Sequence, residues 1–386
     1  MTPAFQRPSL ELADVVQRHG HRLAADAQQQ RILAAITACR TAALGGHVQT
    51  CDHCQHQQIA YNSCRNRHCP KCQASACARW MQERQEELLP VEYFHIVFTL
   101  PDVFNALALA NKCVVYGVLF EAVSQTLQQV AANPRHLGAR IGFLAILHTW
   151  GQNLSLHPHL HCVVPGGGLS QDGSRWMACR PGFFLPVRIL SHVFRGKFVD
   201  LLKRARAKRM LIGAEDGVAF ERLLDAGVKH DWVVYAKPPF AGPQQVLKYL
   251  ARYTHRIAIS NRRLLAMDEQ TVTFRYKDYA HGNRPRTMTL EGAEFLRRFL
   301  MHAVPRGFMR IRHFGLLANR LRTKNLACLH RLLAAACPAS LTATKTPAAV
   351  AEPLLRCPVC GRGHLISGAN LSARELAQRL VRVDSS

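Results

Sequence analysis

The sequence predicts an α+β protein in which a cysteine-rich module precedes a core of mixed strands and helices. Short runs of β-branched and aromatic residues alternate with longer amphipathic segments in an irregular order, unlike the regular strand–helix repeat of a doubly wound sheet. Cysteine and histidine are concentrated between residues 51 and 77, which indicates a separate metal-stabilised module. A further Cys-x2-Cys pair follows a Pro/Ala/Thr-rich linker near the C-terminus.

Local patterns place the elements of this core. Apolar residues recur at helical spacing over 9–45 and 103–132, and the second segment is expected to stop at Asn133-Pro134. Strands are expected where β-branched and aromatic residues cluster, at 93–98, 141–149, 160–164 and 232–236, with a hairpin over 257–276. Further helices are expected at 187–211, from Pro243 to about Thr254, and through the basic region that extends to about residue 337.

The charge of the chain points to a polyanionic partner. Among 386 residues, 50 are Lys or Arg and 25 are Asp or Glu, so the net charge is +25. A protein this basic is usually matched to nucleic acid. No stretch approaches the roughly 18 apolar residues of a membrane helix, and the first residues lack a signal-peptide pattern. We therefore expect a cytoplasmic, DNA-associated protein without a membrane partner, whose 14 cysteines are reduced or metal-bound.

Two Cys-x2-Cys pairs in the N-terminal region predict a structural zinc site. Cys51 and Cys54 form one pair, Cys69 and Cys72 form the other, and 14 residues separate the pairs. Each pair can grip a metal from a tight turn, so that two pairs complete a tetrahedral site for Zn²⁺. Cys64 and His68 exceed the need of one ion and are additional candidate ligands. The C-terminal pair, Cys357 and Cys360, has the pattern of half a zinc ribbon, with Cys328 and Cys337 as candidate partners, or else forms an unmetallated turn.

A second candidate metal site lies in the segment His157-Pro158-His159-Leu160-His161. Alternate side chains of a strand point to one face, so His159 and His161 project together while Leu160 faces the core. Two imidazoles at this spacing can bind a divalent cation. A third ligand is needed. Gln152 can supply a carbonyl oxygen, and His148 is the alternative.

Two tyrosines share one face of the helix expected after Pro243. Tyr249 and Tyr253 are four residues apart, so their hydroxyls lie on the same side. Lys248, Arg252 and Arg256 form an adjacent cationic stripe at the same spacing. A phenol needs a metal-polarised phosphate or nearby cations to react at neutral pH. This arrangement suits attack on DNA phosphates.

Arginine and phenylalanine are interspersed later in the chain. Arg310 and Arg312 belong to a basic block that also contains Phe299, Phe308 and Phe314. Arginine fixes phosphates and aromatic rings stack on unpaired bases, a combination typical of proteins that bind single-stranded DNA. No G-x4-G-K-[ST] sequence is present, so we expect duplex melting to need a separate host helicase or supercoiling.

These motifs resemble the HUH (His-hydrophobe-His) transposases of the insertion sequence 91 family. The resemblance runs through the cysteine-rich module, Phe98-Thr99-Leu100-Pro101, the segments 148–168 and 249–263, and the stretch 305–320, so that it covers nearly the whole chain to residue 325. It implies an HUH endonuclease core, an antiparallel sheet with helices, behind a zinc-binding module and ahead of a basic helical C-terminal region.

The resemblance also implies the chemistry and the division of the chain. By it, His159 and His161 bind catalytic Mg²⁺ or Mn²⁺, and Tyr249 and Tyr253 are the nucleophiles that form a 5′-phosphotyrosine with single-stranded DNA at element ends and target DNA. The expected units are residues 1–88 with zinc, a catalytic unit over 90–325, and a C-terminal tail over 326–386. A plasmid rolling-circle replication initiator or relaxase shares this chemistry, and a non-catalytic zinc-dependent DNA-binding regulator is the alternative from another class.

Overall fold

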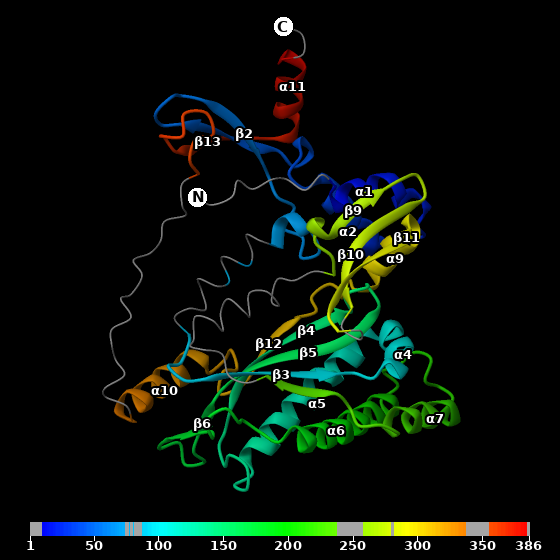
Figure 1. Ribbon diagram of the computed structural model, residues 1–386, viewed down its shortest axis with the longest axis vertical. Coiled ribbons are helices and arrows are strands. Elements are labelled where there is room, and N and C mark those ends of the chain that lie inside the picture. The colour runs from blue at the N-terminus through cyan, green and yellow to red at the C-terminus, as the bar shows by residue number, and fades with distance from the viewer. Residues whose placement is uncertain are drawn as a thin grey trace.

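The structure is a computed structural model that describes residues 10–73, 77, 80, 87–237, 258–278, 282–336 and 355–383. Its centre is a five-stranded antiparallel sheet in the order β12-β4-β5-β3-β8 (Figure 1). The strands are β3 (Tyr93–Thr99), β4 (Gly142–Trp150), β5 (Leu156–Pro165), β8 (Val234–Lys237) and β12 (Ile311–Gly315). The predicted α+β class, with an antiparallel sheet and helices, is confirmed.

Two long helices cover one face of this sheet. They are α5 (Lys112–Ala132) and α6 (Val187–Ala207), and α7 (Gly217–Val228) continues the layer beyond them (Figure 1). Aromatic side chains fill the space between the layers. For example, the Phe98 ring on β3 packs edge-on against Phe194 on α6, with 5.2 Å between ring centroids. Leu160, one of the alternate β5 residues on this face, is fully buried.

The segment expected as one helix over 103–132 contains a break at Asn111. Residues Asn105–Ala110 form α4, and α5 starts at Lys112. The Asn111 amide nitrogen donates to Ile212 O at 2.9 Å, and its amide oxygen accepts from Ile212 N at 2.7 Å. Because an asparagine side chain offers both a donor and an acceptor, it pairs with a distant loop in place of continuing the helix.

Strand β12 is a correction to the sequence expectation. The region from 277 to about 337 was expected to be mainly helical, yet residues 311–315 pair antiparallel with Gly142–Ile146 of β4. Phe314 stacks on Phe143 of β4 at 5.2 Å between centroids. The pairing with β4 is long-range, so the basic composition of the segment concealed a strand that tertiary contacts stabilise. Helices α9 (Gly292–Met301) and α10 (Arg322–Ala336) flank it, and the expected boundary between residues 325 and 326 falls within α10.

A second core joins the N-terminal helices to a three-stranded sheet. Helices α1 (Leu12–His19) and α2 (Ala27–Ala38) pack with α9 and the antiparallel strands β9 (Leu264–Met267), β10 (Thr271–Asp278) and β11 (Arg284–Glu291). At Gly292, the first residue of α9, α1 packs tightly against α9, because a Cβ there would lie 2.2 Å from the His19 ring. A side chain at Gly292 would therefore force the two helices apart.

The remaining small sheet has the order β13-β1-β2. Its strands are β1 (Gly46–Cys51), β2 (Gln57–Tyr61) and β13 (Leu365–Leu371), and α11 (Ala373–Val383) follows. The C-terminal segment therefore returns to the N-terminal module, as Figure 1 shows at the top of the molecule. Within the described ranges, no helix is both long and apolar enough to cross a membrane.

Candidate metal centres

Three histidines converge on the face of the central sheet that α5 and α6 leave uncovered. His159 and His161 project from β5, and His148 of β4 lies directly opposite His159 in the strand pairing. One ring nitrogen of each histidine lies within 4.8 Å of the others. The His148 and His161 ring centroids are 4.5 Å apart, and those of His159 and His161 are 4.8 Å apart. Three imidazoles gathered in this way can hold a divalent cation.

Hydrogen bonds to the Nδ1 atoms select which ring nitrogens face the centre. His159 Nδ1 donates to the His157 carbonyl oxygen at 2.6 Å, which leaves the Nε2 lone pair of His159 available. His161 Nδ1 lies 2.8 Å from His95 Nε2. When His161 donates in this pair, its own Nε2 lone pair is directed toward the centre.

His95 is a supporting residue that the sequence reading missed. Burial, together with the nearby Lys237 and His159, lowers its pKa to about 3, so the ring is neutral and its Nε2 can accept from His161. The two rings stack at 5.0 Å between centroids. A signal was available in the sequence, because His95 is a polar residue within the apolar run Tyr93–Phe98 of a strand. Such a residue on a buried strand needs a partner.

The structure brings His148 to the histidine pair, while Gln152, the other predicted ligand, lies in the turn. Gln152 lies beyond the end of β4, and its main-chain carbonyl accepts a hydrogen bond from the Arg263 guanidinium. The reason is the register of the β4–β5 hairpin, in which residues facing one another have numbers that sum to 307, as in His148 with His159. This register places the His148 side chain beside His159 on the same face of the sheet.

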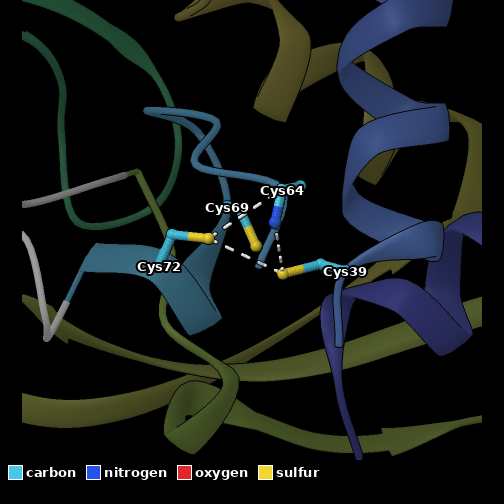
Figure 2. A group of neighbouring side chains, drawn as sticks. All are labelled: Cys39, Cys64, Cys69 and Cys72. Carbon is cyan, nitrogen blue, oxygen red and sulfur yellow. Dashed lines mark hydrogen bonds between the residues drawn. The ribbon is translucent and has the colours of Figure 1, made fainter. Parts of the chain in front are cut away.

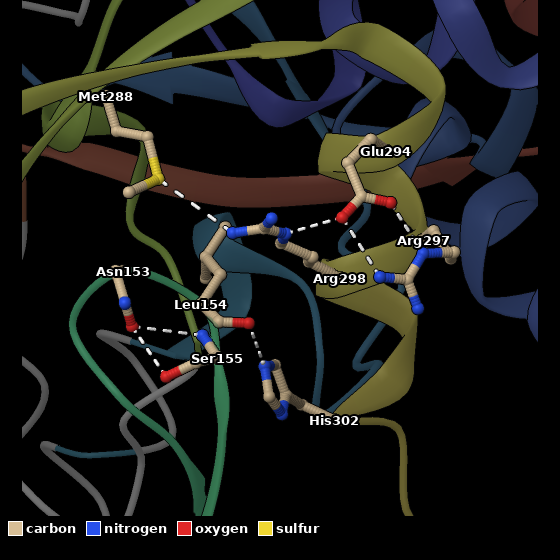
Figure 3. Close-up of polar contacts among 8 residues, drawn as sticks. All are labelled: Asn153, Leu154, Ser155, Met288, Glu294, Arg297, Arg298 and His302. Carbon is tan, nitrogen blue, oxygen red and sulfur yellow. Dashed lines mark hydrogen bonds and ion pairs between the residues drawn. The ribbon is translucent and has the colours of Figure 1, made fainter.

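Residues of the second core hold His148 and the β4–β5 turn in place. The His148 ring stacks on Trp150, with 4.6 Å between centroids, and Trp150 belongs to the second core. His302 at the end of α9 contacts Thr149 Oγ1 at 3.3 Å and the Leu154 carbonyl oxygen at 3.2 Å. Figure 3 shows this contact to Leu154, together with Glu294 of α9, which binds both Arg297 and Arg298. The helix and the turn are thus fixed relative to each other.

His302 predicts a loss of stability in acid. Burial lowers its pKa to about 4, against an ordinary value of 6.5, so the unfolded chain binds a proton that the folded chain excludes. Stability therefore falls as the pH falls below about 6.5. We expect the wild type to lose on the order of 2 kcal/mol more than His302→Gln between pH 7.5 and 5.0 in urea unfolding. Parallel pH curves for the two proteins would contradict the assignment.

The two N-terminal Cys-x2-Cys pairs belong to different clusters, which corrects the expected four-cysteine site. Cys69 and Cys72 gather with Cys39 and Cys64, here called the inner cysteine cluster (Figure 2). Cys51 and Cys54 gather with Cys357 and Cys360, here called the outer cysteine cluster. Sequence spacing predicts each pair as one unit, but it does not determine which pairs meet in space.

The inner cysteine cluster has the dimensions of a four-thiolate zinc site. Cys72 Sγ lies 3.6 Å from the sulfurs of both Cys39 and Cys64. Sulfurs at 2.3 Å from a tetrahedral Zn²⁺ are about 3.8 Å apart. A hydrogen bond from Cys69 lowers the pKa of Cys64 to about 5, so one thiolate is already favoured. Cys64 therefore joins the cluster as expected, while Cys39, at the end of α2, was not among the predicted ligands.

His68 stands apart from the inner cysteine cluster in the described part of the chain. It is buried, and burial together with the nearby Arg310 and Arg67 lowers its pKa to about 3, so the ring is neutral. Its closeness to Cys69 in the sequence made it a candidate ligand, but the knuckle turns its side chain toward residues near α9.

A cysteine substitution tests the inner cysteine cluster. Because Cys39 and Cys72 belong to the second core, we expect Cys39→Ser to lose one equivalent of zinc and to unfold the N-terminal module. Zinc content by elemental mass spectrometry and hydrogen exchange over α2 are the measurements. Cys113→Ser, at an exposed cysteine outside both clusters, is the matched control. Full zinc content in Cys39→Ser would show that the ion is held elsewhere.

Of the predicted DNA-contacting residues, Arg310 and Arg312 lie in the described part of the chain. The Arg312 guanidinium lies over the rings of Phe120, at 4.2 Å, and Phe308, at 5.0 Å, on the helix side of the sheet. Burial, together with the nearby Arg67, lowers the pKa of Arg310 to about 10. Five predicted residues lie outside the described residues: Tyr249, Tyr253, Lys248, Arg252 and Arg256.

Two family models match this chain. One, described as a putative transposase, matches residues 142–325, and another, described as a transposase zinc-binding domain, matches residues 12–100. The first range contains the three histidines, and the second contains the inner cysteine cluster together with Cys51 and Cys54.

Full-length relatives agree with these matches. The chain is 50% identical over 380 residues to the putative transposase y4qJ of Sinorhizobium fredii, covering 94% of this chain and 95% of the relative. It is 28% identical over 416 residues to the transposase for insertion sequence element IS801 of Pseudomonas savastanoi pv. phaseolicola, covering 98% and 96%. Among solved structures, a metal-bound conjugative relaxase TrwC in complex with oriT DNA aligns at 13% identity with a TM-score of 0.24, over 42% of this chain and 71% of that chain.

Proposed function

Because the chain belongs to the insertion sequence 91 family of rolling-circle transposases, we propose that it cleaves single-stranded DNA with a tyrosine nucleophile at the three-histidine centre. The observation that carries this proposal is the convergence of His148, His159 and His161 on one face of the sheet, with Nδ1 of His159 and His161 hydrogen-bonded away from the centre. These three side chains are the proposed ligands of Mg²⁺ or Mn²⁺. When bound, the cation polarises the scissile phosphate and offsets the charge of the transition state.

The proposed nucleophiles are Tyr249 and Tyr253. The phenol oxygen of one tyrosine bonds to the phosphorus, and the bond from phosphorus to the 3′ oxygen breaks. The phenol proton passes to solvent, and the departing 3′ oxygen takes up a proton to become a free hydroxyl. The products are a 5′-phosphotyrosine and a free 3′ end, which a second transfer can rejoin.

Cationic residues are proposed to hold the strand in place. Lys248, Arg252 and Arg256 form a stripe adjacent to the tyrosines in the sequence pattern, and they are proposed phosphate contacts. Arg310 is a further proposed contact, because its pKa is lowered by burial beside Arg67 and a phosphate there would favour the charged form. Arg312 is proposed to act chiefly through its stacking on Phe120 and Phe308.

The remaining proposals concern where and with what the protein acts. The net charge of +25 supports action on DNA at element ends and target sites, in the cytoplasm. Since the sequence contains no phosphate-binding loop for ATP, a host helicase is the proposed source of single-stranded DNA.

A gel assay for covalent adducts tests this function. A labelled single-stranded oligonucleotide from an element end is incubated with the full chain in Mg²⁺ or Mn²⁺, and with chelator as the control. We expect a detergent-resistant protein–DNA adduct only with the metal. The same oligonucleotide in duplex form is expected to give little adduct. Binding without any adduct would instead favour a zinc-dependent DNA-binding regulator.

A further inference from the structure

The outer cysteine cluster unites the two ends of the chain. Cys51 Sγ lies 3.7 Å from Cys360 Sγ, and Cys54 Sγ lies 3.7 Å from Cys357 Sγ. All four sulfurs lie within 4.8 Å of one another. Four sulfurs on a tetrahedral zinc are about 3.8 Å apart, whereas disulfide sulfurs are about 2.05 Å apart. The spacing fits four separate thiolates around one ion.

The two Cys-x2-Cys turns have the same backbone geometry although some 300 residues separate them. In each turn the residue after the second cysteine has positive φ, 59° at Gln55 and 63° at Gly361. In each turn that residue also donates its N–H to the carbonyl of the first cysteine, at 3.2 Å from Gln55 to Cys51 and 3.0 Å from Gly361 to Cys357. Two matching turns that face each other form a symmetric four-sulfur site.

Backbone N–H groups point at the sulfurs in both turns. Cys51 Sγ accepts from the amides of His53 and Cys54, each at 3.4 Å. Cys360 Sγ accepts from the Gly363 amide at 3.4 Å. Such bonds stabilise a thiolate rather than a thiol, as metal binding requires.

Close packing between the turns depends on Gly363. A Cβ at this position would lie 2.6 Å from Cys51 Sγ and 2.5 Å from Asp52 Oδ1. Asp52 completes the contact, because its carboxylate accepts from the His364 amide at 2.8 Å and its own N–H donates to the His364 carbonyl at 3.1 Å. The C-terminal turn is therefore seated against the N-terminal turn by specific contacts.

Strand pairing brings the same segments together. β13 pairs antiparallel with β1 from Gly46 opposite Leu371 to Cys51 opposite Leu365. The next helix, α11, packs against the short 3-10 helix η2 (Ala42–Leu44), and Leu376 of α11 is fully buried. This 3-10 helix follows Cys39 of the inner cysteine cluster by three residues. The family matches cover residues 12–100 and 142–325, so neither includes this C-terminal segment.

We propose that Cys51, Cys54, Cys357 and Cys360 bind a second structural Zn²⁺, which attaches the C-terminal segment 355–383 to the N-terminal module. Binding converts four thiols to thiolates and releases four protons to solvent, with no change in oxidation state. The site completes one zinc ribbon from the two ends of the polypeptide. It is independent of the cleavage chemistry, because the histidine centre contributes no ligand to it.

Zinc content tests the ion itself. Cys357→Ser/Cys360→Ser is expected to contain one zinc equivalent fewer than the wild type by elemental mass spectrometry, while Cys113→Ser contains the wild-type amount. The single substitution Cys360→His, which leaves Cys357 in place, is expected to keep the zinc equivalent that the double variant loses, because a Cys₃His set also binds zinc. Wild-type zinc content in the double variant would overturn the proposal, and so would failure of Cys360→His to bind more zinc than Cys360→Ser.

Cutting the linker tests the attachment. A protease site is introduced into the segment 338–353 of the full chain, and the cut protein is passed over a size-exclusion column. We expect the C-terminal fragment to elute with the rest of the chain in zinc and to separate after treatment with chelator. In the Cys357→Ser/Cys360→Ser background it should separate without chelator. A fragment that stays bound in chelator would show that strand pairing is sufficient, which would overturn the attachment role of the ion.

Discussion

Replacing both Tyr249 and Tyr253 with phenylalanine is expected to abolish the covalent protein–DNA adduct. Phenylalanine keeps the ring and removes only the hydroxyl, so the loss measures the nucleophile, at on the order of a thousandfold or more in cleavage rate. Binding of single-stranded DNA, with the same dependence on salt, is expected to persist because Lys248, Arg252 and Arg256 are unchanged. The measurements are adduct yield on a denaturing gel and binding by fluorescence anisotropy.

The single variants Tyr249→Phe and Tyr253→Phe show whether both tyrosines act as nucleophiles or only one does. In the helix expected from the sequence, four residues span about 6 Å along the axis, so we propose that either hydroxyl approaches the same phosphate. Each single variant is expected to lose transposition, while at least one still forms an adduct through the other phenol. An adduct formed by the double variant, and mapped to another residue, would overturn the mechanism. Silent single variants would indicate that the rings serve only in packing.

His148→Ala is expected to reduce cleavage as severely as His161→Ala, on the order of a hundredfold or more, because each removes one of three proposed ligands. Gln152→Ala is expected to stay within a few-fold of the wild type. His157→Ala is the matched control for loss of a histidine next to the centre, since alanine removes a ring that contacts His159 but retains the main-chain carbonyl that bonds to it. Single-turnover rates across a Mn²⁺ titration are the measurement.

Two outcomes would contradict this assignment. If His148→Ala cleaved normally while Gln152→Ala did not, the third ligand would come from the turn. If excess Mn²⁺ restored neither His148→Ala nor His161→Ala at all, and their metal affinity were unchanged, the histidines would serve some role other than binding the ion.

The sequence predicted the parts of the site that depend on local periodicity. Alternation along residues 156–165 was sufficient to place His159 and His161 on one face and Leu160 on the other. The third histidine needed one further step, the hairpin register, which pairs His148 with His159. His95 depended on β3 lying beside β5, a long-range pairing that no local pattern specifies.

The cysteines show the same limit more clearly. Each Cys-x2-Cys pair formed the expected tight turn, but sequence spacing did not identify its partners. Cys69 and Cys72 meet Cys64 and also Cys39, which lies 33 residues before Cys72, whereas Cys51 and Cys54 meet the C-terminal pair Cys357 and Cys360. The three Cys-x2-Cys pairs have the same spacing in the sequence, so spacing alone does not determine which pairs share a metal ion. Only the packing of α2 and the pairing of β13 with β1 decide between them.

The position of β1 between β2 and β13 has a consequence for synthesis of the protein. A ribosome finishes β2 early, but roughly 300 residues must still be translated before β13 emerges, which takes on the order of 15–60 s at 5–20 residues per second. During that interval one edge of β1 has no strand to pair with, and the outer cysteine cluster contains only Cys51 and Cys54 of its four cysteines. A polypeptide released early by a premature stop codon would never complete this sheet. The small sheet and the outer cysteine cluster are therefore complete only in a polypeptide that has been translated through β13.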